Sequence, residues 1–148
     1  MDHLSNWYVR RSRRRFWDGE PAALATLHET LDAVTRLMAP LAPFVTERVW
    51  QDLFVAAVPD APASVHLAQW PTVDAAAIDP GLNAAMDLAR RLVELGRGAR
   101  AEARVKTRQP LSRVLVPSSS HARLTPELLA EIAAELNVGA VESFASAG

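Results

Sequence analysis

Two basic stretches carry most of the chemistry that this sequence could perform. The first, from Leu4 to Trp17, reads LSNWYVRRSRRRFW and holds five arginines. Trp7, Arg10, Arg14 and Trp17 recur at intervals of three and four, which places them on one face of a helix. Clustered arginines repel one another unless phosphate or acidic protein neutralises them, and aromatic rings stack on unpaired bases. We interpret this face, with Arg11 beside it, as a candidate RNA-binding surface.

An alternative for this stretch stays open, because a basic helix alone is a weak signal. The aromatic side chains could belong to a core, while the arginines pair with acidic residues elsewhere in the chain or face water.

The second basic stretch, residues 100–114, reads RAEARVKTRQPLSRV and surrounds an expected helix end. Its candidate RNA contacts are Arg104, Lys106 and Arg108. Cations near the carboxyl end of a helix are also favoured by the helix dipole without any ligand. A solvated basic surface is therefore the competing interpretation here.

Other chemistry finds no support in the sequence. None of the four histidines lies three or four residues from another, and the chain has no cysteine, so the spacing of a zinc site is missing. Ser118 and His121 are close in sequence, but no G-x-S-x-G surrounds them, and no glycine-rich phosphate loop occurs. We predict no catalytic residue, no metal ligand and no cofactor for this chain.

The composition is that of a globular protein, with 49% hydrophobic and 22% charged residues in 148. The net charge of −1 conceals alternating blocks: basic residues prevail in 1–17 and 96–113, and acidic residues prevail in 18–95 and 114–148. No apolar run reaches the roughly 18 residues of a membrane helix, and the amino terminus is polar. We expect a cytoplasmic protein without a membrane partner.

The elements that must position the basic residues are mainly helical. The first helix is expected over 4–17 and to stop at Gly19, and the second begins at Pro21. The apolar stripe expected for the second helix consists of Leu24, Leu27, Leu31, Val34, Met38 and Leu41. A third helix over 44–54 should carry an apolar face of Val45, Val49 and Leu53, broadened by Phe44, Trp50 and Phe54. Residues 64–71 suggest a short extended piece.

A fourth helix should follow Asp79 and Pro80, with Gly96, Ala99 and Ala103 allowing close approach by another helix. Beyond Pro110 the pattern changes to a strand over 111–116, a turn over 118–121, a helix capped by Thr125 and ending at Leu136, and a strand over 138–144. The predicted fold is mainly α: an antiparallel helical bundle over 1–109, followed by a small β-α-β appendage over 110–148.

Four segments, in order, resemble the anticodon-binding and following region of isoleucyl-tRNA synthetases, a family of class I enzymes. They are LSNWYVRRSRRRFW at 4–17, LMAPLAPFVTERVW at 37–50, SVHLAQWP at 64–71 and RAEARVKTRQPLSRVLV at 100–116. The second is similar in related synthetases for aliphatic amino acids. The first and the fourth, with its VKTRQPL, are more particular to the isoleucine enzymes.

The resemblance implies a helical bundle that lies along the anticodon stem and loop of tRNA(Ile). The family joins isoleucine to this tRNA with ATP and Mg²⁺, hydrolyses mischarged products in an editing domain, and in some members carries Zn²⁺ in a tail. The HIGH and KMSKS signatures of its catalytic domain have no counterpart here. We therefore expect an inactive tRNA-binding piece of such a ligase, with tRNA(Ile) and the catalytic domain of the same polypeptide as partners.

Two further expectations concern this piece. Met1 is expected to be an added start and the carboxyl end to be cut within a small α/β junction subdomain. The competing function is a structural bundle that docks on the rest of the enzyme and touches no RNA. Salt dependence of binding would separate the two functions.

Overall fold

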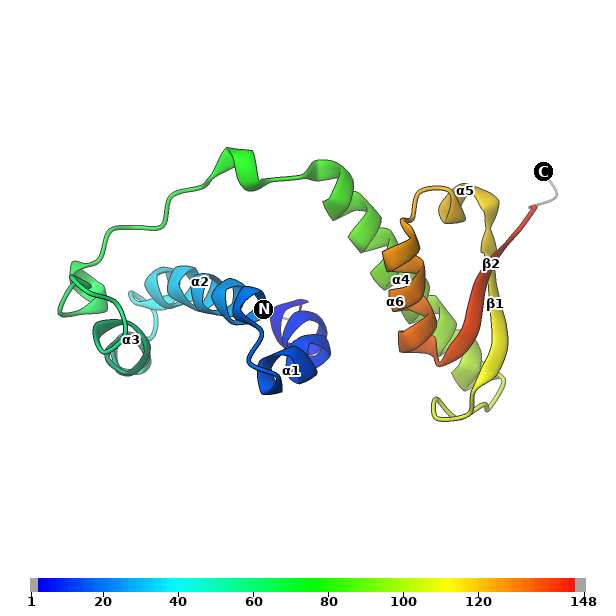
Figure 1. Cartoon of the computed structure of the whole chain (residues 1–148), viewed down its shortest axis with the longest axis horizontal. Helices are drawn as coiled ribbons and strands as arrows, with labels where there is room; N and C mark the ends of the chain where they lie inside the picture. Colours follow the sequence, from blue (N-terminus) through cyan, green and yellow to red (C-terminus); the bar gives the residue numbers. More distant parts are fainter. Residues whose placement is uncertain (1–2, 146–148) are drawn as a thin grey trace. The chain divides into compact units, whose positions relative to one another are not determined.

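The computed structural model describes residues 3–145 and is mostly helical, with one two-stranded parallel sheet (Figure 1). It divides into two compact units, Met1–Val73 and Asp74–Gly148. The fourth helix thus belongs to the second unit, whereas the predicted domain boundary between 109 and 110 stays a prediction. Among the described residues, no helix is both long and apolar enough to span a bilayer.

The first unit is built from helices that follow the expected order. A π-helical turn η1 (His3–Val9) continues into α1 (Arg10–Trp17), and Gly19 ends this helix with a left-handed φ of 67°. Next come α2 (Pro21–Met38) and α3 (Pro43–Trp50), each with a proline in its first turn, and α3 runs on as η2 (Gln51–Val55). The predicted helices are present.

The core of this unit centres on Trp50, which is 1% exposed, and on Phe54, Ala39 and Val65. The two rings stack with centroids 4.9 Å apart. The Trp50 indole donates to the carbonyl oxygen of Pro62 over 2.8 Å. This bond ties the long connection after η2 to α3.

The predicted apolar faces of α2 and α3 were partly wrong. In α2 the buried residues are Ala23 and Thr35, while Leu24, Met38 and Leu41 are exposed. Within its unit α2 packs mainly on α1, α3 and a 3-10 turn. Which face of a helix is buried depends on such neighbours, and the apolar stripe alone does not specify them.

In α3 and its continuation η2, the buried residues are Thr46, Trp50 and Phe54, which recur at four-residue intervals. Val45 is exposed and Leu53 lies at the surface, because the wide indole and phenyl rings occupy the contact with α2. The extended piece expected over 64–71 is instead the 3-10 turn η3 (Val65–Leu67), in which the Ser64 hydroxyl accepts from the His66 amide.

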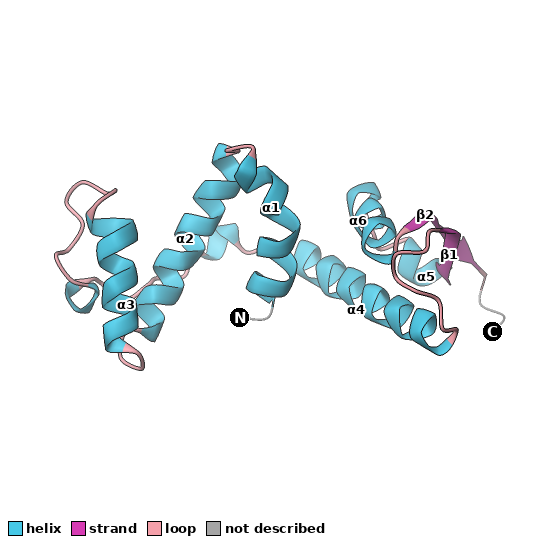
Figure 2. Ribbon diagram, turned by 90° about the horizontal axis from the view of Figure 1, so that it is seen from below, coloured by secondary structure: helices cyan, strands magenta, loops and turns pink. Residues whose placement is uncertain are grey.

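The second unit opens with the 3-10 turn η4 (Ala75–Ala77), followed by α4 (Pro80–Glu102). As expected, the Asp79 carboxylate caps α4 by accepting from the Leu82 amide at 2.9 Å. Strand β1 (Leu111–Pro117), one helical turn α5 (Ser118–His121), helix α6 (Pro126–Leu136) and strand β2 (Val138–Phe144) complete the unit (Figure 2). The predicted turn at 118–121 is thus helical.

The two strands pair in parallel, from Leu111 opposite Val138 to Pro117 opposite Phe144. Helices α4 and α6 pack closely beside them: a Cβ added at Gly96 would lie 2.5 Å from Leu136 Cδ1. The expected close approach at Gly96 is therefore confirmed, and the partner is α6.

Candidate nucleic-acid interface

We call residues 4–17 the basic helix, and its inner side consists of Tyr8, Ser12 and Phe16. The Tyr8 hydroxyl donates to the carbonyl oxygen of Ala23 in α2 over 3.0 Å, and its ring meets Phe16 edge-on. Ser12, which lies four residues from each of them, is buried. Tyr8 therefore anchors the basic helix to α2.

The structure only partly agrees with the prediction that Trp7, Arg10, Arg14 and Trp17 share one face of the basic helix. Trp7 lies in the π-helical turn, where the i to i+5 bonding alters the spacing on which the prediction rested. The Trp7 ring lies under the Arg11 guanidinium, 5.7 Å from its centre, and Arg10 Nε donates to the carbonyl oxygen of Asn6 at 2.9 Å. Trp7 is half-buried, so a cation-π pair, rather than an open ring, occupies this end.

At the other end of the basic helix, Trp17 is 84% exposed and remains available for stacking. Arg14 lies 3.7 Å from the Asp18 carboxylate. Arg15 forms two bonds of 2.7 Å with Glu20, and this contact lowers the pKa of the Glu20 carboxyl. Two arginines thus face acidic side chains just beyond the helix, as the alternative interpretation allowed.

The second basic stretch forms a tight structure at the end of α4, and we call residues 103–110 the basic loop. The Val105 amide donates to the Arg100 carbonyl and the Arg104 amide to the Ala101 carbonyl, which is the hydrogen-bond pattern of a Schellman motif. The residue after the cap in this motif is usually glycine, because its φ is positive. Here it is Arg104, with φ 56°.

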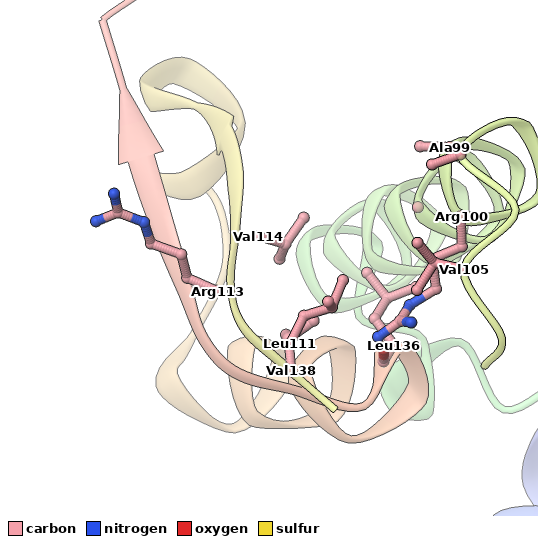
Figure 3. Close-up of a pocket in the computed structure, with 10 residues that line it drawn as sticks. Ala99, Arg100, Val105, Leu111, Arg113, Val114, Leu136 and Val138 are labelled. Carbon is pink, nitrogen blue, oxygen red and sulfur yellow. Dashed lines mark hydrogen bonds between the residues drawn. The ribbon is translucent and has the colours of Figure 1, made fainter. Parts of the chain in front are cut away.

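The basic loop is held from beneath by Arg100, a residue that is only 6% exposed. Its Nη1 donates to the carbonyl oxygen of Lys106 at 3.0 Å. Its Nη2 lies within hydrogen-bond distance of three more carbonyl oxygens, those of Gln109 at 3.0 Å, Leu136 at 2.7 Å and Asn137 at 3.2 Å. Figure 3 shows the guanidinium extending toward Leu136. One buried cation therefore joins the loop to the end of α6.

A second bond fixes the loop from the same side. Asn137, itself left-handed at φ 51°, donates from Nδ2 to the carbonyl oxygen of Thr107 at 3.2 Å. Val105 is half-buried, while the side chains of Arg104, Lys106 and Arg108 are exposed. Within residues 3–145 none of these three cations takes part in an ion pair.

The structure therefore keeps the eight predicted contacts in two separate groups, one in each unit. Sequence reasoning missed the roles of Arg100 and Asn137. A signal for Arg100 was present, because it interrupts the small residues Gly96, Ala99 and Ala103 on the inner part of α4. Asn137, between a helix and a strand, occupies a position where asparagine often ends helices with a positive φ.

Each unit also contains a cavity among its described residues. In the first unit a cavity of about 420 Å³ is lined by Glu29, Asp32 and Asp60 together with Arg36. Three carboxylates against one guanidinium disfavour an RNA phosphate there. In the second unit an apolar cavity of about 170 Å³ lies between α4 and β1, with Arg100 and Val105 in its wall, and Arg113 points away from it (Figure 3).

Comparison with known proteins adds two findings. Residues 1–115 match the family described as the anticodon-binding domain of tRNA ligase. This range includes the basic helix and the basic loop. Several similar relatives are named isoleucine–tRNA ligase.

The identity to these relatives is high. The chain is 64% identical over its whole length to the protein of Cutibacterium acnes and 61% to that of Streptomyces coelicolor. It is 46% identical to the Thermus thermophilus protein over 93% of the chain. The chain spans only 13 to 14% of the length of these relatives.

Proposed function

We propose, from the premise that the chain belongs to the family of anticodon-binding domains of tRNA ligases, that it binds the anticodon stem and loop of tRNA(Ile). The observation that carries the proposal is the family match over 1–115, together with the high identity to isoleucine–tRNA ligases. The exposed cations of the basic loop and the exposed ring of Trp17 support it, because phosphates and unpaired bases are what such groups bind.

The wider setting is also part of the proposal. The complete polypeptide would attach isoleucine to tRNA(Ile) in the cytoplasm with ATP and Mg²⁺, edit mischarged tRNA, and hold any Zn²⁺ in other parts of its chain. The helices described above would belong to an antiparallel bundle in that enzyme. This chain lacks the adenylate-forming motifs, so we expect no isoleucine-dependent exchange of pyrophosphate into ATP from a clean preparation.

The direct test is a fluorescence anisotropy titration of the 148-residue chain with an isoleucine tRNA transcript and with an unrelated tRNA. We expect tighter binding to the isoleucine tRNA and a steep loss of affinity with salt, because released counterions accompany each phosphate contact. Absence of binding at low salt would refute the proposal.

A second candidate function, docking on the rest of the enzyme, is favoured by one observation. Apolar side chains around the turn between α2 and α3 are exposed: Leu41, Val45 and Phe44, the last at 90%. Such patches usually mark an interaction surface. Docking through them would be insensitive to salt, and Phe44→Ser should weaken it without changing the affinity for tRNA.

A further inference from the structure

We propose that the basic loop is a preorganised site for RNA phosphates, in which Arg104, Lys106 and Arg108 make the contacts and Arg100 is the positioning residue. This inference rests on the proposed function and deepens it. It assigns the phosphate contacts to one loop and a structural cause to their geometry.

The loop carries a cation at a position where this helix-ending motif favours glycine. A left-handed φ is costly for a residue with a side chain, and glycine avoids this cost. Arg104 adopts φ 56° in the motif that ends α4. Strained backbone of this kind concentrates at functional sites.

Hydrogen bonds from side chains outside the basic loop fix its backbone. Arg100 donates to two carbonyl oxygens within the loop, those of Lys106 and Gln109, and to two more at the end of α6. Asn137 adds a bond to Thr107, midway between them. Three hydrogen bonds, to Lys106, Thr107 and Gln109, therefore hold a short segment, and two more join Arg100 to the end of α6. The cations of this segment have no acidic partner among residues 3–145.

The buried charge of Arg100 also favours anions at the basic loop. Its guanidinium lies beneath the loop and adds a positive charge that solvent screens poorly. Its donors are directed to carbonyl oxygens, so this charge is not cancelled by those partners. Anions that approach Arg104, Lys106 and Arg108 meet a fixed positive potential, and little backbone freedom of the loop is lost when they bind.

The sharpest single variant is Arg104→Gly in the 148-residue chain. Glycine suits the left-handed φ, so the melting midpoint of the second unit should rise by about 4 °C or more. Binding to the isoleucine tRNA transcript should weaken, and its salt slope should flatten by up to about 0.9, the value for one phosphate contact. A stabilised protein that binds less well separates function from structure.

The triple variant Arg104→Ala, Lys106→Ala, Arg108→Ala should flatten the slope by up to about 2.7 between roughly 50 and 200 mM salt. The matched control is Arg123→Ala, which removes one exposed cation from the same unit outside the loop and should leave the slope unchanged. An unchanged slope in the triple variant would overturn the inference while the proposed function stood. If the unaltered chain binds no tRNA, both are wrong.

The positioning role of Arg100 needs a coupling measurement. Lysine keeps the charge but cannot reach four carbonyl oxygens with one ammonium group, so Arg100→Lys should loosen the loop. We expect the affinity to fall about two- to tenfold, the cost of ordering one or two side chains on binding. In the background of the triple variant the same substitution should have no effect on affinity.

An equal effect of Arg100→Lys in both backgrounds would contradict positioning, because a purely structural arginine acts whether or not the loop cations are present. Should Arg100→Lys fail to fold, Asn137→Gly serves in the same cycle. Glycine accepts φ 51° and removes only the bond to Thr107. It should also lower the affinity only where the loop cations are present, and no coupling in this cycle would likewise overturn the positioning role.

Discussion

The basic helix and the basic loop contain similar side chains but make their charge available in different ways. In the basic helix, Arg14 and Arg15 face Asp18 and Glu20, and Arg11 covers Trp7. In the basic loop the exposed cations have no acidic partner among the described residues, and a buried arginine fixes the backbone that carries them. The density of arginine in a sequence is therefore a poor measure of the charge that a ligand can meet.

The two units also anchor their connections by different charged groups. In the first unit the Glu47 carboxylate accepts from Gln51 at 2.8 Å, from the Ser64 hydroxyl at 2.8 Å and from the Val65 amide at 3.1 Å. In the second unit Arg100 donates to carbonyl oxygens. Glu47 is half-buried and Arg100 is buried, so the loss of Arg100 should be the more costly.

The largest expected effect is that of Arg100→Met, which keeps the volume but removes every donor. Four carbonyl oxygens lose this donor, although those of Lys106 and Asn137 keep the backbone amides of Gln109 and Leu111. We expect a loss of about 3 kcal/mol or more in the free energy of unfolding of the second unit. Chemical denaturation followed by circular dichroism measures it. Arg14→Met is the matched control on the basic helix and should change stability by less than about 0.5 kcal/mol. Similar losses of unfolding free energy for Arg100→Met and Arg14→Met would show that Arg100 is no more important for stability than an exposed arginine of the basic helix.

Next in size is Gly96→Ala, at the contact of α4 with α6. The added Cβ would lie 2.5 Å from Leu136 Cδ1, so the buried Leu136 side chain must shift, and overpacking of this kind costs about 1 to 3 kcal/mol. Gly98→Ala is the control, because no atom lies within 4 Å of its Cβ position. It should be neutral or stabilise by up to about 1 kcal/mol. Since the end of α6 carries two acceptors of Arg100, Gly96→Ala should also speed amide exchange in the basic loop. Equal stability of Gly96→Ala and Gly98→Ala would show that the contact between α4 and α6 accommodates the added methyl group.

How far the sequence predicts this molecule can be judged from such positions. Helix and strand locations followed local signals: proline at helix starts, Asp79 and Thr125 as caps, Gly19 as a stop. These signals act within a few residues, so one chain suffices to interpret them. The parallel pairing of β1 and β2 and the burial pattern of α2 depend on which neighbours are present, which a local pattern does not contain.

The candidate site shows the same limit. The eight predicted contacts were chosen by charge and spacing, which identify cations but not their partners. That Arg15 meets Glu20 while Arg104 has no such neighbour is a property of the folded chain. Arg100 was not distinguished from the rest of the second basic stretch, because its burial arises from Lys106, Gln109 and Leu136 together, at separations of 6, 9 and 36 residues.

A smaller and pH-dependent loss is expected for Glu47→Gln in the first unit. The hydrogen bonds from Gln51 and Ser64 hold the pKa of the Glu47 carboxyl below its ordinary value of 4.5. A depressed pKa in the folded state gives stability that is present above the unfolded value and is lost as the pH falls through the folded value. Wild type should therefore exceed the variant in unfolding midpoint at neutral pH, and the difference should vanish in acid. A difference that stays constant from neutral pH down to acid would contradict this origin.

The smallest effect on stability, and the one that tests the basic helix as a ligand surface, is expected for the double variant Arg10→Ala, Arg14→Ala. Both side chains are exposed, and the contact of Arg14 with Asp18 is long, so the denaturation midpoint should hardly change. If the helix meets the phosphate backbone, affinity for the isoleucine tRNA should fall and the salt slope should flatten by up to about two contacts, less than for the basic loop. If these arginines serve docking within the protein, the midpoint should fall and the affinity should stay. Solvated arginines would change neither quantity, and that result, beside a flattened slope in the basic loop variants, would assign the phosphate contacts to the loop alone.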